Sequence, residues 1–324
     1  MELPASVQIV EVGPRDGFQI EPVFIPTEQK IRIINQLSQT GFQRIEATSF
    51  VHPKAIPQLA DATEVMSGII RVKDTTYTAL VPNKKGVERA LQSGVKEVNF
   101  VVSASESHNK NNVNMSTAES LQTIREAARM ALDNGIKITG SIATTFGCPF
   151  EGRVSPQKVE EIAQEYLDMG VRELILADTT GMANPLQVTE MIRRLRNKFK
   201  NVEIRFHFHN TRNAGMANVL AAMLEGIAVF DGSIGGLGGC PYAPGATGNI
   251  PTEDMVHMLE SMGINTGINL PKLIDCAKMV QDLLGRELPG QVMKAGPVPW
   301  AVDKQAIDKS KYLCPKNTGK VVDY

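Results

Sequence analysis

Eight short runs rich in β-branched residues recur along the chain and alternate with longer stretches of helical period. This alternation is typical of parallel strand-helix-strand units, and eight such units predict a closed (β/α)8 TIM barrel. The pattern leaves an open, doubly wound sheet as the alternative. The predicted strands are VQIVEV at 7–12, RIEATSF at 44–50, TYTALV at 76–81, EVNFVVS at 97–103, KITGSIATT at 137–145, ELILADT at 173–179, EIRFHFH at 203–209 and VFDGSI at 229–234.

The stretches between these runs carry helix boundary signals. In the helix expected over 27–41, Thr27 is the expected N-cap and Gly41 the stop. Ser116 and Glu119 have the spacing of a capping box. We therefore expect one catalytic barrel over residues 1–290, followed over 291–324 by an irregular extension rich in Pro, Gly and Lys.

The composition favours a globular enzyme that acts on a small molecule. Of the 324 residues, 42% are hydrophobic and 21% charged, and the formal net charge of −1 gives no basic surface for nucleic acid. No apolar stretch is long enough to cross a membrane, and the first residues lack the pattern of a signal peptide. Four widely spaced cysteines indicate neither a zinc site nor a disulfide framework, so we expect a cytoplasmic protein.

Two of the five histidines, His207 and His209, lie one residue apart in the predicted seventh strand. Side chains two apart in a strand project to the same face, so both imidazoles point into the barrel while the neighbouring phenylalanines face the helices. Two neutral imidazoles can share a cation through their lone pairs, which favours a metal site. The alternative is a pair of core histidines that find hydrogen-bond partners.

The turn after the first strand, EVGPRDG, supplies a carboxylate for such a site. Closure of the barrel places Arg15 and Asp16 beside the seventh and eighth strands, where Asp16 can join the two histidines. Glu11 is expected to orient Arg15 from inside the barrel. Glu46 and Asp178, at the ends of the second and sixth strands, either hold an imidazole or Arg15 in place or cap the following helix. The turn alone is equally compatible with a surface Arg-Asp pair.

The loop after the eighth strand, GGLGGCPYAPGATGN at 235–249, is rich in glycine and carries Cys240 at its centre. Such a loop can fold over a ligand, and a covered thiol can donate or accept a proton. A plain connector with a buried cysteine is the alternative.

Together these segments resemble 3-hydroxy-3-methylglutaryl-CoA lyase, from the superfamily of metal-dependent (β/α)8 lyases and Claisen-type synthases. The resemblance covers residues 6–286, and it rests on EVGPRDGFQ, IEATSFV, ASES, GCPFEG, LADTTG, HFHN and above all GGLGGCPYAPGATGN. The RDG and H-x-H motifs are shared across the superfamily, whereas the glycine-rich loop is specific to the lyase branch.

The resemblance implies a divalent cation, Mg²⁺ or Mn²⁺, a homodimer, and a role in leucine degradation and ketone body formation. It also implies a retro-Claisen cleavage of an acyl-CoA substrate into acetyl-CoA and acetoacetate, in which Arg15 polarises the thioester carbonyl and Cys240 delivers or relays a proton. The metal ligands that it implies are Asp16, His207, His209 and Asn249, and its supporting residues are Glu11, Glu46, Asp178 and Glu253.

This chain departs from the lyase pattern at three positions. Phe18 stands where leucine is usual, Ile20 where asparagine is usual, and Asn210 where aspartate is more usual. Phe18 and Ile20 predict a more apolar rim, which leaves open a lyase for a bulkier branched acyl-CoA. A condensing acyl-CoA/2-oxo acid synthase, an inactive binding paralogue and an Fe(II) oxygenase also stay open as alternatives, the last on its ligand set alone.

Overall fold

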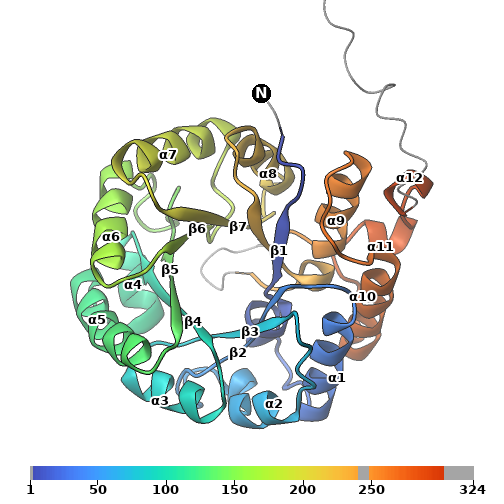
Figure 1. Ribbon diagram of the computed structural model, residues 1–324, viewed down its shortest axis with the longest axis horizontal. Helices are drawn as coiled ribbons and strands as arrows, with labels where there is room; N and C mark the ends of the chain where they lie inside the picture. The colour runs from blue at the N-terminus through green and yellow to red at the C-terminus, as the bar shows by residue number, and fades with distance from the viewer. Residues whose placement is uncertain (1–2, 240–247, 303–324) are drawn as a thin grey trace, which may run out of the picture.

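The computed structural model describes residues 3–239 and 248–302, and its eight parallel strands close into a barrel in the order β1 to β8. Figure 1 looks into this ring, with most of the helices packed around it. All eight predicted strands are confirmed, and the open-sheet alternative is excluded because β1 pairs with β8. The strands are β1 Gln8–Glu11, β2 Arg44–Ser49, β3 Thr76–Leu80, β4 Glu97–Ser103, β5 Lys137–Ala143, β6 Glu173–Asp178, β7 Glu203–Phe208 and β8 Val229–Gly232.

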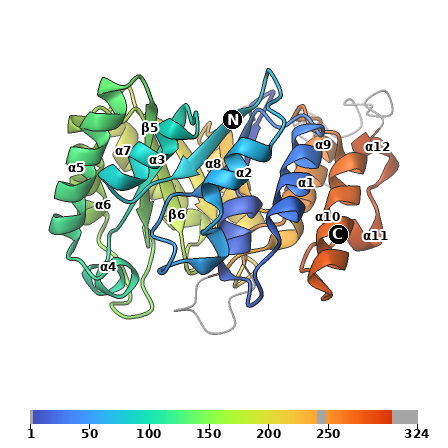
Figure 2. The ribbon, with the colours of Figure 1, turned by 90° about the horizontal axis from the view of Figure 1, so that it is seen from below.

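Helices follow the strands around the barrel, as expected for repeated strand-helix units. A further helix, α4, is inserted between β4 and α5 and lies at one end of the barrel in Figure 2, and α10, α11 and α12 follow α9 at the end of the described chain. The α-helices of the described residues are α1 Thr27–Ser38, α2 Ala62–Gly68, α3 Lys84–Gln92, α4 Glu106–Val113, α5 Thr117–Asp133, α6 Pro156–Asp168, α7 Pro185–Lys198, α8 Gly215–Leu224, α9 Thr252–Ser261, α10 Leu270–Leu284, α11 Val292–Ala295 and α12 Pro299–Val302.

The helix boundaries follow the sequence signals with two corrections. The capping box of Ser116 and Glu119 is confirmed at the start of α5. Gly41 is not the stop of α1, because the helix ends at Ser38 with Gln39 as its C-cap. Gly41 lies in the turn that follows, with a φ of +106° that favours glycine. Thr27, however, is the first residue of α1 and Pro26 is its N-cap. The Thr27 hydroxyl instead donates a hydrogen bond to Asp61 Oδ2 at 2.8 Å.

The chain after residue 290 is more regular than expected. Two short helices, α11 and α12, pack against α9 at the edge of the barrel in Figure 1. The rest of the predicted extension, from residue 303, lies outside the described residues. No helix in the described part of the chain is both long and apolar enough to span a membrane.

The apolar core fills the layer between the strands and the helices. Phe206 and Phe208 on β7 stack with ring centroids 4.8 Å apart and belong to this core, as the strand alternation predicts. At Gly140 on β5, an added Cβ would lie 2.8 Å from the ring of Tyr166, so glycine allows α6 to pack closely on the sheet.

The barrel interior is lined in part by charged side chains instead of the branched apolar residues that usually fill it. Ion pairs connect them across four strands, and every one of these side chains is buried. The residues are Arg44 on β2, Glu97 on β4, Glu173 on β6, and Arg205 on β7.

Candidate metal centre

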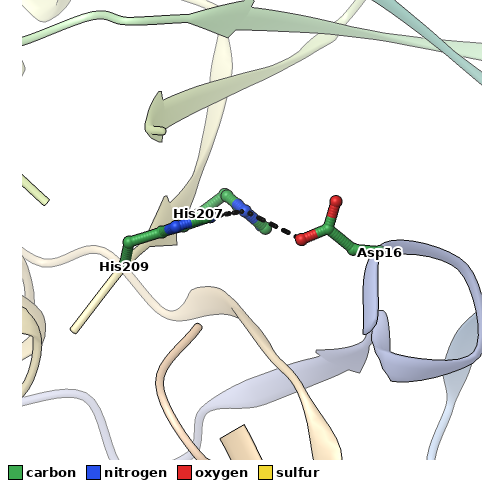
Figure 3. A group of neighbouring side chains, drawn as sticks. All are labelled: Asp16, His207 and His209. Carbon is green, nitrogen blue, oxygen red and sulfur yellow. Dashed lines mark hydrogen bonds and ion pairs between the residues drawn. The ribbon is translucent and has the colours of Figure 1, made fainter. Parts of the chain in front are cut away.

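Two segments far apart in the sequence meet at one end of the barrel. Asp16 lies in a π-helical turn, Gly13–Gly17, directly after β1, while His207 lies on β7 and His209 follows it. All three side chains are buried. Figure 3 shows both imidazoles and the Asp16 carboxylate directed toward one another. One ligand atom from each residue lies within 4.8 Å of the other two, so the three can reach a common ion.

The contacts of the two imidazoles fit a cation. His207 Nε2 lies 3.0 Å from His209 Nε2 and 3.8 Å from Asp16 Oδ2. Two imidazole lone pairs at this separation repel each other unless a proton or a cation lies between them. His209 Nδ1 is buried and has no hydrogen-bond partner among the described residues. Two imidazoles and a carboxylate form a donor set that suits divalent ions.

The electrostatics of the centre favour charged Asp16 and neutral His209. Burial alone would raise the pKa of Asp16, but Arg15 and the two histidines outweigh it and hold that pKa at about 2. Burial, helped by the neighbouring His207, lowers the pKa of His209 to about 3. A neutral imidazole and an ionised carboxylate are the protonation states that bind metals.

Asn249 reaches the centre because the chain that precedes α9 pairs with the end of β7. His209 and Asn249 form an isolated antiparallel bridge, and Asn249 Nδ2 donates a hydrogen bond to Asp16 Oδ2 at 2.7 Å. Gly238 lies close by with a φ of +101°, and an added Cβ would lie 2.4 Å from Asn249 Nδ2. A side chain at this position would displace Asn249 from Asp16.

Arg15 is buried and held on two sides. Its Nε donates to Glu46 Oε2 at 2.6 Å and its Nη1 to Asp16 Oδ1 at 2.5 Å. Burial alone would lower the pKa of Arg15, but the two carboxylates outweigh it and raise that pKa. Glu46 therefore orients Arg15, the first of its two predicted alternatives, and Asn99 Nδ2 donates in turn to Glu46 Oε1 at 3.2 Å. The burial also excludes a surface Arg-Asp pair.

Glu11 does not orient Arg15 directly, which corrects the expectation from the sequence. Both of its oxygens have other partners: Oε1 accepts from the N–H groups of Gly13 and Ile234, and Oε2 from the Thr252 hydroxyl. Glu11 thus ties the turn after β1 to the chain after β8. Burial raises its pKa to about 7.

Asp178 stabilises the loop between β6 and α7. Its Oδ1 accepts hydrogen bonds from the N–H groups of Met182 and Ala183, at 2.8 and 3.1 Å, while Asn184 is the N-cap of α7. Asp178 Oδ2 is buried and has no hydrogen-bond partner within residues 3–239 and 248–302. Burial raises its pKa to about 6.

The remaining predicted residues fall into three groups. Glu253 is buried on α9, where it accepts from the N–H of Gly235 at 3.0 Å, and burial raises its pKa to about 8. Phe18 is fully buried in the core and cannot line a rim, which corrects that expectation, whereas Ile20 is 38% exposed. Cys240 and most of the predicted lid lie outside the described residues.

The sequence of the chain matches a model of a known protein family. The HMGL-like family model matches residues 6–280. The chain belongs to the HMGL-like family. This agrees with the resemblance inferred from the glycine-rich loop and with a barrel that carries a possible divalent-metal site.

Several relatives of this HMGL-like protein are named hydroxymethylglutaryl-CoA lyase. The hydroxymethylglutaryl-CoA lyase of Bacillus subtilis is 49% identical over 90% of this chain and 97% of its own length. The mitochondrial hydroxymethylglutaryl-CoA lyase of Macaca fascicularis is 43% identical over 90% of each chain. A solved structure of an HMG-CoA lyase from Acinetobacter baumannii, in complex with coenzyme A and 3-methylmalate, aligns with a TM-score of 0.88 at 47% identity, over 92% of this chain and 98% of that one.

One contact of the metal centre of this HMGL-like protein was not predicted from its sequence. Asp231 on β8 lies with its Oδ2 3.1 Å from His207 Nδ1, and Arg205 Nε lies 3.4 Å from Asp231 Oδ1. Both residues stand within strands that were recognised from their apolar pattern. A charged residue at an inward-facing strand position was the signal that could have identified them.

Proposed function

We propose that this protein is a divalent-metal-dependent carbon-carbon lyase that cleaves 3-hydroxy-3-methylglutaryl-CoA into acetyl-CoA and acetoacetate. The observation that carries the proposal is the buried group formed by Arg15, Asp16, His207 and His209 in a chain that is 49% identical to a hydroxymethylglutaryl-CoA lyase. A hydroxyl next to a metal and a thioester next to a guanidinium are the two groups that a retro-Claisen cleavage requires.

Asp16, His207, His209 and Asn249 would hold the cation, with Asn249 contributing its amide oxygen. When bound, a divalent cation supplies a Lewis acid that lowers the pKa of the substrate's C3 hydroxyl. Asp16 is suited to this task because its two oxygens have separate roles: Oδ1 pairs with Arg15, and Oδ2 faces the imidazoles. We propose Mg²⁺ or Mn²⁺ because the set combines hard oxygen donors with imidazoles.

Arg15 acts at the other end of the bond that breaks. A general base accepts the proton of the C3 hydroxyl, whose oxygen becomes the ketone oxygen of acetoacetate. The C2–C3 bond cleaves, and its electron pair moves into the thioester as the enolate of acetyl-CoA, so the proton lost at the hydroxyl balances the one that C2 later gains. Because Glu46 and Asp16 engage Nε and Nη1, we assign Nη2 of Arg15 to the thioester oxygen. A proton delivered through Cys240 to C2 then completes acetyl-CoA.

Glu11, Asp178 and Glu253 support the site in this proposal rather than contact the substrate. Glu11 and Glu253 fix the backbone at Ile234 and Gly235, where the glycine-rich segment begins. Asp178 holds the β6–α7 loop. The cytoplasmic location, the homodimer and the barrel-plus-extension division at residue 290 remain proposals from the sequence.

Incubation of the purified protein with hydroxymethylglutaryl-CoA tests the function. We expect acetoacetate release that requires Mg²⁺ or Mn²⁺, disappears after chelation and returns when the ion is added back. Activity that is equal before and after chelation would remove the metal from the reaction. Release of free CoA with a 2-oxo acid as acceptor, and no acetoacetate, would instead identify a condensing synthase.

A bulkier branched 3-hydroxyglutaryl-CoA is the second candidate substrate, and it now rests on Ile20 alone. This exposed apolar residue lies four positions after Asp16, where a polar residue is usual in the lyases that the sequence resembles. The same assay, run with both acyl-CoA esters, distinguishes the candidates by kcat/KM. A clear preference for hydroxymethylglutaryl-CoA would eliminate the bulkier substrate.

A further inference from the structure

A chain of buried charges crosses the barrel interior and ends at a metal-site histidine. Lys137 is half exposed at the start of β5 and pairs with Glu97. From there the ion pairs run inward through alternating charges, with each step between 2.7 and 3.4 Å. The chain passes from Glu97 to Arg44, Glu173, Arg205 and Asp231, and Asp231 contacts His207.

Stability alone does not explain why charged side chains occupy the barrel interior. Transferring ionised groups from water into a protein interior has a large desolvation cost, and replacing a buried ion pair with apolar residues is often neutral or stabilising. The interior of a (β/α)8 barrel is ordinarily filled by branched apolar side chains. Five buried charged side chains are therefore less favourable in this space than apolar side chains would be. A function for Asp231, the residue of the chain that contacts His207, would explain why they are present.

The two oxygens of Asp231 have separate partners. Oδ1 lies 3.4 Å from Arg205 Nε, and Oδ2 lies 3.1 Å from His207 Nδ1. Arg205 Nε and Asp231 Oδ1 form an ion pair without a hydrogen bond among the described residues, and the positive charge of the guanidinium favours an ionised Asp231 carboxylate. An ionised carboxylate only accepts hydrogen bonds, so His207 Nδ1 must carry the proton that it donates.

The tautomer of His207 follows from this contact. A neutral imidazole has one protonated nitrogen and one lone pair. With the proton on Nδ1, the lone pair is on Nε2, the atom that faces His209 Nε2 and Asp16 Oδ2. His209 lacks such support within the described residues, since its Nδ1 has no partner there. The centre thus contains one fixed imidazole and one that is less constrained.

We propose that Asp231 is a positioning residue that presents the Nε2 lone pair of His207 to the metal, and that Arg205 holds the Asp231 carboxylate in place for this task. The inference rests on the metal site of the proposed function, but not on the identity of the acyl-CoA substrate. Carboxylates that accept a hydrogen bond from a metal-binding histidine commonly set its orientation, and their loss weakens metal binding.

Replacement of Asp231 by asparagine tests the proposal through metal binding without substrate. We expect the dissociation constant for Mn²⁺, measured from the electron paramagnetic resonance signal of the free ion, to rise about 10- to 100-fold in Asp231→Asn. The matched control is Glu260→Gln. Glu260 is also a buried carboxylate, which accepts hydrogen bonds from Thr266, but it lies on α9 outside the barrel interior. This control should leave the dissociation constant unchanged.

A second readout reports the tautomer itself. The chain has five histidines, so ¹⁵N-histidine spectra of the metal-free protein are tractable, and His207→Gln identifies the His207 signals. In alkaline buffer, where the ring is neutral, the parent should show His207 protonated at Nδ1 and not at Nε2, and Asp231→Asn should show a mixture of tautomers or protonation at Nε2. A purely structural role for Asp231 would not change this signature.

Loss of one buried charge can prevent folding, so a charge-balanced variant completes the test. Asp231→Asn combined with Arg205→Gln removes one charge of each sign, and it should show the same weakening of Mn²⁺ binding. A Mn²⁺ dissociation constant within about twofold of the parent's, about 0.4 kcal/mol, in either variant overturns the proposal. A parent that binds no Mn²⁺ overturns it as well, whereas a parent that binds Mn²⁺ but does not cleave hydroxymethylglutaryl-CoA removes only the proposed substrate.

Discussion

Arg15→Gln is expected to lower kcat for hydroxymethylglutaryl-CoA cleavage by at least about 10³-fold, because loss of a single neutral oxyanion donor already costs about 10²- to 10³-fold in other enzymes. Arg15 is a buried cation between Glu46 and Asp16, so its charge acts in a poorly screened environment. Glutamine retains an amide that can donate to Glu46, which limits the effect on folding. The measurement is kcat at saturating Mn²⁺, together with the Mn²⁺ dissociation constant.

Metal binding separates this effect from general damage to the site. Arg15 is not a ligand in our account, so the Mn²⁺ dissociation constant of Arg15→Gln should change by less than about tenfold, or about 1.4 kcal/mol. Arg15→Lys keeps the charge but loses the planar guanidinium, and its kcat should fall between those of Arg15→Gln and the parent. If kcat of Arg15→Gln stayed within tenfold of the parent's, Arg15 would have no part in stabilising the enolate.

His209→Ala should weaken Mn²⁺ binding by more than about 100-fold, since loss of a residue that only supports a ligand already costs about 10- to 100-fold. The imidazole of His209 is buried, and its Nε2 lies 3.0 Å from His207 Nε2, so the described structure gives it no task other than the metal centre. We expect kcat to fall with the occupancy of the metal and to recover in part at high Mn²⁺. Titration of both quantities with Mn²⁺ tests this.

His52→Ala is the matched control. His52 is exposed in the loop after β2, where its Nδ1 accepts a hydrogen bond from the N–H of Lys54. Its removal should alter neither Mn²⁺ affinity nor kcat. Mn²⁺ binding by His209→Ala as tight as that of the parent would mean that the paired imidazoles are not ligands.

The fold was predictable from local pattern because each strand and helix carries its own periodicity. Runs rich in β-branched residues, such as EVNFVVS, and amphipathic stretches, such as the one that begins at Thr117, are recognisable without tertiary context. The errors lie where a side chain has a distant partner. Threonine is common at helix N-caps, but the Thr27 hydroxyl donates a hydrogen bond to Asp61, 34 positions later.

The site was predictable where the strand alternation fixes direction. His207 and His209 project to the same face because they lie two positions apart in one strand segment, and closure of the barrel brings Asp16 to them. The partner of Asp231 was not predictable, because it depends on the register between β7 and β8, in which Phe206 lies opposite Phe230. The role of Glu11 was not predictable for the same reason. Its carboxylate accepts hydrogen bonds from the N–H of Ile234 and the hydroxyl of Thr252, more than 220 positions away.

A crystal of the Mn²⁺-loaded protein, measured at the manganese absorption edge, reveals whether the two imidazoles and the carboxylate hold one ion. We expect one anomalous-difference peak within about 2.5 Å of Asp16 Oδ2 and of the Nε2 atoms of His207 and His209. A fully loaded, active crystal with its manganese peak elsewhere, away from these three atoms, would contradict it.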